Sequence, residues 1–133
     1  MTSRPHVAYR YAVIRAVPRA DREEFLNIGV VLYCQSAAFL GARFDSDLER
    51  LRVLGLGDDD LDGVLASIAA IEAMCAGSDQ ARAVAGRSQA FRFGHITAPR
   101  STVVRAGPSH GGVTADPQTS LDELYAALVA LAR

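Results

Sequence analysis

The sequence predicts a single α+β domain, and three stretches carry that prediction. Residues 28–34 form an apolar run without alternation, which is typical of a central strand covered on both faces. Residues 8–17 alternate bulky and small side chains, as a strand does. Residues 61–75 repeat apolar side chains at helical spacing. We therefore expect roughly five strands, in an antiparallel or mixed sheet packed against two to three helices.

The first expected strand has two unlike sides. Its alternate positions are Tyr9, Tyr11, Val13, Arg15 and Val17 on one side, against Ala8, Arg10, Ala12, Ile14 and Ala16 on the other. The alanines would allow a helix to pack closely on their side. Arg15 interrupts the bulky side, so its guanidinium must pair with an acid, reach solvent or hold a ligand.

A charged connection over residues 18–24 leads to the central strand. We expect Asp21 to cap a short helical turn there, with a glutamate at capping-box spacing. A helix is the alternative for the apolar run, but the run is short and contains Gly29, which disfavours helix. A tight turn at residues 35–37 then predicts a hairpin, with its second strand over residues 38–44.

Three helices are expected, over residues 46–54, 60–76 and 120–132. Their expected N-caps are Asp45 or Ser46, Asp59 or Asp60, and Ser120. The long helix should end at Gly77. The residues expected on its buried face are Leu61, Val64, Leu65, Ile68, Ile71 and Cys75. The last helix should turn inward Leu121, Leu124, Tyr125, Leu128 and Leu131. Acids at the start of the long helix suit its dipole and need no acidic site.

The segment between the last two helices is expected to hold two more strands. Residues 91–96, which include His95, alternate like one strand, and residues 101–105 like another. Residues 78–88 are polar, and we expect them to be mobile. The glycine-rich residues 106–112 are expected to form a loop.

The length, net charge and composition of the chain limit the class of protein. At 133 residues the chain is expected to form one domain, residues 1–133, without metal or disulfide support. The net charge of -1 argues against a general affinity for nucleic acid or an anionic membrane, although all fourteen basic residues are arginine. Neither a signal-peptide pattern nor a membrane-length apolar run occurs, so a cytoplasmic protein is expected. Cys34 and Cys75 should be buried free thiols.

The familiar chemical motifs are missing. The sequence has no phosphate-binding loop with a lysine, no dinucleotide-binding glycine pattern, no Gly-x-Ser-x-Gly elbow and no metal-ligand spacing. We therefore expect no metal and no cofactor, and no catalytic residues can be named. Residues 97–105 and 109–112 remain, and they combine forked arginine donors, hydroxyls, a histidine and glycine N–H groups. That combination suits a phosphate or a carboxylate.

A second polar group lies where the first strand ends and the central strand begins. In a compact sheet it could meet residues 100–105 at one edge. The full set of ligand-binding candidates is Arg15, Arg19, Asn27, Arg100, Ser101, Thr102, Arg105 and His110. The alternative is a closed structural network, in which the arginines pair with Glu23, Glu24 or Asp116 and the glycines only turn the chain.

Five blocks of the chain resemble one known family. They are residues 11–19, 23–32, 97–104 and 108–112, and the Asp116-Pro117 pair. In order and spacing they are similar to the bacterial domain of unknown function 3037, over nearly the whole chain. The resemblance assigns no activity. Such proteins are also associated with HipA-like kinases, which resemble toxin–antitoxin components, so it implies a protein partner of that kind.

Two functions stay open. The first is a non-enzymatic binding or regulatory module that acts through a protein partner, with a HipA-like kinase as the candidate and oligomerisation left open. The second is a small enzyme or sensor that binds a phosphorylated ligand through the arginines and His110. No carboxylate or cysteine has a catalytic companion at a set spacing, which favours the first.

Overall fold

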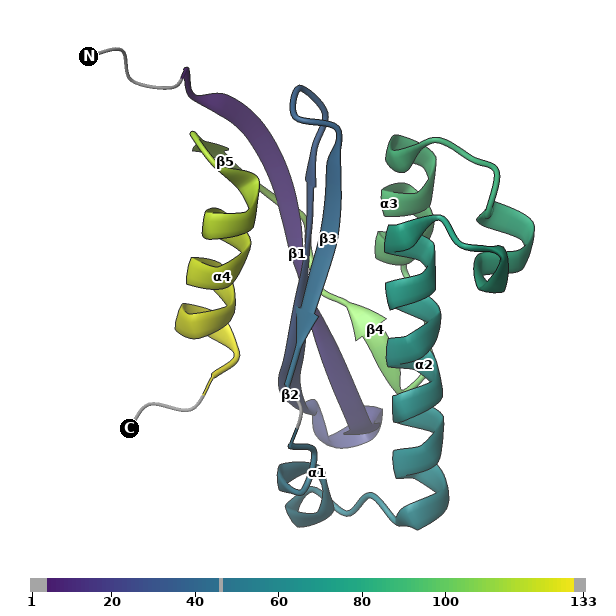
Figure 1. Cartoon of the computed structure of the whole chain (residues 1–133). Coiled ribbons are helices and arrows are strands. Elements are labelled where there is room, and N and C mark those ends of the chain that lie inside the picture. The colour runs from purple at the N-terminus through teal and green to yellow at the C-terminus, as the bar shows by residue number, and fades with distance from the viewer. Residues whose placement is uncertain (1–4, 46, 131–133) are drawn as a thin grey trace.

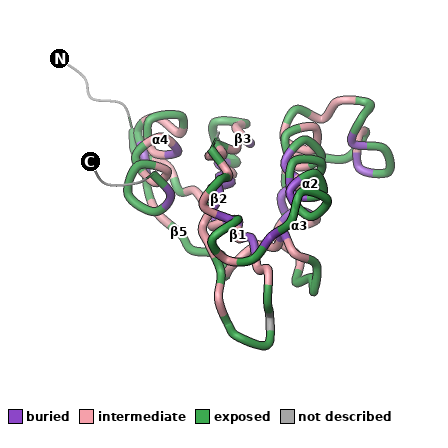
Figure 2. Tube along the Cα trace, turned by 90° about the horizontal axis from the view of Figure 1, so that it is seen from below, coloured by how far each residue is buried: buried purple, intermediate pink, exposed green. Residues whose placement is uncertain are grey.

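The computed structural model describes residues 5–45 and 47–130, and arranges them in three layers (Figure 1). An antiparallel sheet forms the middle layer. Helices α2 (Asp58–Ala76) and α3 (Gln89–Thr97) cover one face, and α4 (Pro117–Leu128) lies against the other, as the view along the layers in Figure 2 shows. The predicted α+β class is confirmed.

The sheet has five strands built around the longest one. They are β1 (Val7–Arg19), β2 (Glu24–Cys34), β3 (Phe39–Phe44), β4 (Val104–Ala106) and β5 (His110–Thr114). The order is β3-β2-β1-β4, and β5 also pairs with β1. Because β1 is 13 residues long, β4 and β5 can pair with successive parts of the same edge.

The apolar run of β2 is a central strand, as predicted. Val30, Val31 and Leu32 are all fully buried. Val31 belongs to the core under α2 and α3, whereas Val30 and Leu32 belong to the core under α4. Burying each such side chain contributes about 1.5–3 kcal/mol, so both faces of this strand hold the layers together.

The small side of β1 packs as expected. Ala12, Ile14 and Ala16 are fully buried in the core beneath α2 and α3. The predicted hairpin is also present, since β2 pairs with β3 across a turn in which the Ala38 N–H donates to the Gln35 carbonyl. Alternation and local turn chemistry therefore place the first three strands correctly.

Helix α2 matches its prediction except at its start and at one position. It ends at Gly77, whose left-handed backbone (φ 66°) is the usual stop for a helix. It begins at Asp58 after the N-cap Gly57, rather than after Asp59 or Asp60. Leu65 is 54% exposed, so its predicted inward orientation is wrong.

The short turns on either side of the hairpin differ from expectation. Helix α1 (Arg50–Val53) is shorter than the predicted helix 46–54, and Ser46 lies outside the described residues. The 3₁₀-helix η1 (Ala20–Arg22) contains Asp21, but the predicted capping box is wrong. The next residue, Glu23, turns the chain with φ 53°, so the glutamate after it already belongs to β2.

Residues 91–96 form most of α3, so the strand predicted there is wrong. The Ser88 hydroxyl caps this helix by accepting a hydrogen bond from the Phe91 N–H at 3.2 Å. The two residues that α3 buries, Phe93 and Ile96, are three positions apart, as a helix requires. The guanidinium of Arg92 ties α3 to α2, because its Nη1 donates to the Met74 and Cys75 carbonyls. Over so short a stretch the sequence fits both the helical and the strand period, and the contact of Arg92 with α2 favours the helix.

The loop predicted over residues 106–112 is shorter than expected, because only residues 107–109 lie outside the strands. Ala106 ends β4 and residues 110–112 begin β5, while the strand expected over 101–105 starts only at Val104. Glycine allows this pairing because it has no side chain. A methyl group on Gly112 would lie 2.4 Å from the ring of Tyr9, its partner on β1. The glycines therefore make room for side chains of β1.

The last helix begins earlier than expected. Its N-cap is Asp116, whose carboxylate accepts from the Gln118 N–H at 3.1 Å, with Pro117 in the first turn. Ser120, the predicted cap, instead donates to the Thr114 hydroxyl at 2.6 Å. The helix ends at Leu128, and Leu131 lies outside the described residues.

Three smaller expectations can also be compared with the structure. The polar segment 78–88 contains the 3₁₀-helix η2 (Asp79–Val84), which buries Ala81 and Val84 and so is anchored to the domain. Both cysteines are free thiols, as predicted; Cys34 is buried and Cys75 partly so. Among the described residues, no helix is long and apolar enough to cross a bilayer.

Candidate functional site: an arginine row on the sheet

The structure brings three of the predicted ligand residues into one row. Arg15 of β1 lies opposite Asn27 of β2 and opposite Arg105 of β4. Cross-strand partners project from the same face of a sheet. The Asn27 Nδ2 donates to the carbonyl of Leu128, the last residue of α4, at 3.0 Å, which identifies this face as the one that α4 covers. We call Asn27, Arg15 and Arg105 the arginine row.

The guanidinium of Arg15 is held between two surfaces. Its Cζ lies 4.3 Å from the centroid of the Phe25 ring, a cation–π contact. On Gly107, a methyl group would lie 2.9 Å from the same Cζ, so a larger residue there would displace the guanidinium. Gly107 is itself fixed, because its N–H donates to the Val13 carbonyl at 2.8 Å. Arg15 is therefore pre-oriented before any ligand arrives.

The row contains polar groups that the described residues do not satisfy. The Nε of Arg15 and the Oδ1 of Asn27 are buried without a hydrogen-bond partner. A buried polar group left in that state costs about 1–3 kcal/mol. The Nε of Arg105 does have a partner, the Thr102 carbonyl at 2.8 Å. The row thus offers one unused donor and one unused acceptor side by side on the sheet.

The two arginines of the row are also an unfavourable pair. Like charges directly opposite each other on neighbouring strands destabilise a sheet. No ion pair between described residues involves Arg15 or Arg105. The closed network with Glu24 is not what forms, because Glu24 pairs with Arg22. An anion placed between the two guanidinium groups would relieve their repulsion.

Arg19 lies outside the row, at the far end of β1. Its Nη2 is 2.9 Å from the Oδ2 of Asp21, and both side chains are well exposed. The hydrogen bond from Arg19 lowers the pKa of the Asp21 carboxyl. The forked donors of Arg19 are therefore already directed at a neighbour in the chain.

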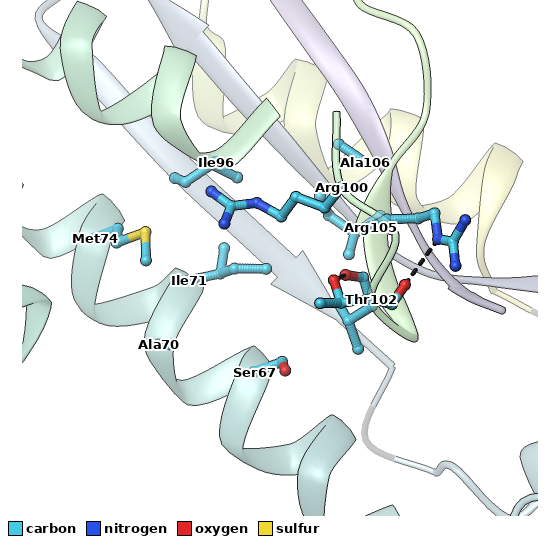
Figure 3. A pocket seen from close by; sticks show the side chains of 11 residues that line it. Ser67, Ala70, Ile71, Met74, Ile96, Arg100, Thr102, Arg105 and Ala106 are labelled. Atoms are coloured by element: carbon cyan, nitrogen blue, oxygen red, sulfur yellow. Dashed lines mark hydrogen bonds between the residues drawn. The ribbon is translucent and has the colours of Figure 1, made fainter. Parts of the chain in front are cut away.

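Arg100 and Thr102 belong to the opposite face. An Nη2 of Arg100 donates to the His95 carbonyl near the end of α3, and the Thr102 hydroxyl donates to the Val104 carbonyl at 2.8 Å. Figure 3 shows the Arg100 side chain extending toward α2 and α3, whereas Arg105 projects the other way from β4. Ser101 is exposed next to them. Arg100, Thr102 and Arg105 nevertheless line one pocket beside β4, although the two arginine side chains extend in different directions.

His110 lies away from the arginine row, on β5, which pairs with the N-terminal part of β1. It is exposed on β5, opposite Tyr11, with the two ring centroids 5.4 Å apart. Tyr9 continues this aromatic strip at 6.1 Å from Tyr11. Burial, followed by the charges of Tyr11 and Glu123, raises the pKa of the Tyr9 hydroxyl. His110 therefore contacts an aromatic ring, and the structure places it away from the arginines.

The remaining chemical groups are bound into the fold. The Cys34 thiol donates to the Ala8 carbonyl at 3.4 Å. Burial raises the pKa of the Cys75 thiol to about 12, which keeps it protonated and unreactive near neutral pH. Within residues 5–45 and 47–130, no group of three or more His, Cys, Asp or Glu side chains could hold a metal ion.

Sequence reasoning missed two residues of the site. Phe25 is two positions before Asn27, so alternation along β2 was a signal that both face the same side. Gly107 gave no such signal. Its role depends on the pairing of β4 with β1, and that pairing cannot be read from the local sequence.

Comparison with known proteins gives one match. A family model described as "Protein of unknown function (DUF3037)" matches residues 11–129. No curated protein matches the chain, and no solved structure matches it.

Proposed function

Since the chain belongs to the DUF3037 family, whose description assigns no activity, we propose a function from the geometry of the site. The protein is a non-enzymatic binding module that recognises a phosphate-type oxyanion with its arginine row. The oxyanion is carried by a protein partner, and a small phosphorylated ligand offers the same chemistry. The observation that supports this proposal is the pair of facing arginines, Arg15 and Arg105, to which no described acid is paired.

Phosphate fits the unsatisfied groups of the row better than a carboxylate does. Its oxygens accept from the guanidinium of Arg15 and from the remaining N–H groups of Arg105. A monoprotonated phosphate also carries an O–H that can donate to the Oδ1 of Asn27 once the side chains that bury this oxygen move aside. A carboxylate at neutral pH is an acceptor only, so it would leave that amide oxygen without a donor.

The shape of the site favours a group presented on a larger molecule. The row lies on the surface of a sheet, and Phe25, which stacks on Arg15, is 46% exposed. Such an open surface excludes little water, whereas catalysis uses water-excluded sites. Burial raises the pKa of the Cys75 thiol to about 12, so it stays protonated near neutral pH, and Ser101 is exposed beside Arg100, outside the row. The HipA-like kinase expected as partner stays a prediction.

A thermal-shift titration with inorganic phosphate, against chloride at equal ionic strength, tests the site. We expect phosphate to raise the Tm of the wild type and to have little effect on Arg15→Gln and Arg105→Gln. The matched control is Arg87→Gln, because Arg87 also stacks on an aromatic ring, with its Cζ 3.6 Å from the centroid of Phe91. An equal phosphate response in all four proteins would refute the proposal.

A second arm separates the two sources of the oxyanion. Phosphoserine peptides and nucleoside monophosphates are titrated into the wild type and into Arg105→Gln, with binding followed by calorimetry. Tighter binding of a peptide supports a protein partner, and tighter binding of a nucleotide supports a small ligand. In either case we expect Arg105→Gln to lose at least tenfold in affinity.

A further inference from the structure

A separate pocket lies on the other face of the sheet, between α2, α3 and β4. Its volume is about 220 Å³. The apolar part of its wall consists of Ile14, Ile71, Met74, Ile96, Val104 and neighbouring alanines. Three of these side chains, Ile14, Ile96 and Val104, belong to the buried core, so the pocket reaches down to the sheet.

Small residues leave this space open. Ala70 and Ser67 line it from α2, and Ala106 lines it from β4 (Figure 3). On the sheet, Ala106 is the partner of Ile14. Since β4 ends at this alanine, no larger side chain of the strand fills the gap between the sheet and α2.

The polar residues that line the pocket include two arginines and no acid. They are Arg100, Arg105, Thr102 and Ser67, and neither Asp nor Glu is among the described lining residues. Arg100 is exposed and extends toward Ile96 and Ile71, as Figure 3 shows. One of its nitrogens donates to the His95 carbonyl, and no ion pair between described residues involves it. Its other N–H groups are available to an anionic ligand.

We infer that this pocket binds a small amphipathic monocarboxylate, such as a medium-chain acyl acid. The apolar chain lies against Ile71, Met74 and Ile96, and the carboxylate accepts hydrogen bonds from Arg100. An apolar cavity of about 150 Å³ is known to hold benzene, so this larger pocket suits a ligand of roughly ten non-hydrogen atoms. The inference does not rest on the arginine row, because the pocket lies on the other face of the sheet and shares only Arg105 with the row.

Octanoate is the probe, used below its micelle concentration, with 1-octanol and octylamine as ligands of equal chain length. Binding is measured by titration calorimetry and mapped by amide chemical shifts. We expect octanoate to bind at least tenfold more tightly than octylamine or octanol and to shift amides of α2, α3 and β4. Failure of octanoate to bind, equal binding of all three ligands, or shifts confined to the α4 face would overturn the inference.

Two variants and one control locate the site. Ser67→Leu fills the pocket and should abolish octanoate binding. Arg100→Gln keeps the pocket but should weaken octanoate at least tenfold, with octanol unchanged. The control is Arg15→Gln, since Arg15 belongs to the arginine row and is not one of the residues that line the pocket. It should leave octanoate binding intact while losing the phosphate response, so the two proposals fail separately. Full octanoate affinity in both Ser67→Leu and Arg100→Gln would contradict the inference.

Discussion

The two faces of the sheet differ most sharply along β1, where neighbours in sequence belong to different layers. Ile14 and Ala16 are fully buried beneath α2 and α3. Arg15, between them, faces the side of α4 with its Nε buried and without a partner. Helix α4 packs on β2 and β3, so it leaves the strip of β1 and β4 on that face less covered. One face is thus built for packing, and part of the other presents unsatisfied polar groups.

The largest effect should come from placing a charge in the packed face. Val31→Asp puts a carboxylate at a fully buried position of the central strand, and we expect a loss of about 5 kcal/mol or more. Circular dichroism and soluble yield are the measurements. Val113→Asp is the control, because Val113 is 67% exposed on β5 and should tolerate the charge. A soluble, folded Val31→Asp protein would show that the packed face does not hold the layers together.

A smaller substitution, Gly29→Ala, tests how tightly the same face is packed. In Gly29→Ala the new methyl group would lie 2.3 Å from Cδ1 of Phe44, so we expect a loss of about 1–3 kcal/mol. Gly63→Ala on α2 meets nothing within 4 Å and should gain about 0.5–1 kcal/mol from helix propensity. Urea denaturation measures both. Equal effects of the two substitutions would mean that Phe44 yields freely, and that this face is looser than described.

The polar face is tested by reversing one charge of the arginine row. Arg105→Glu replaces a like-charge pair with Arg15 by an opposite-charge pair, and we expect it to be about 0.2–1 kcal/mol more stable than Arg105→Gln. Urea denaturation at low salt gives the difference, which should shrink at high salt. If Arg105→Glu is instead the less stable of the two, the side chains of the row do not interact.

The last prediction concerns pH and belongs to the packed face again. Burial raises the pKa of the Cys75 thiol from 9.0 to about 12. Between these values the unfolded thiol has lost its proton while the folded thiol keeps it, so this contribution to stability is complete below pH 9 and is lost as pH rises toward 12. We expect the Tm of the wild type to fall more steeply over this range than that of Cys75→Ala. Parallel curves would show that the thiol is open to water.

The first half of the fold was predictable because its signals are local and repeated. The apolar run of β2, the alternation of β1 and the glycine at the end of α2 each favoured the structure that forms, and Gly29 disfavoured the helix that was the alternative for β2. The strand predicted over residues 91–96 failed because a short stretch fits two periods, and Arg92 reaches α2 only in the folded chain. The loop predicted over residues 106–112 was inaccurate for a related reason, since glycine is compatible both with a turn and with a strand whose neighbours leave no room for a side chain.

The sequence by itself determined that the Arg15 guanidinium must pair with an acid, reach solvent or hold a ligand, because Arg15 interrupts the bulky side of an alternating strand. Only the tertiary structure decided that Arg105 and Asn27 flank it and that Arg100 lies on the other face. The physical reason is strand register. A shift of one residue in the pairing of β1 with β4 would turn every side chain of β4 to the opposite face, and that register is set by the packing of segments far apart in the chain.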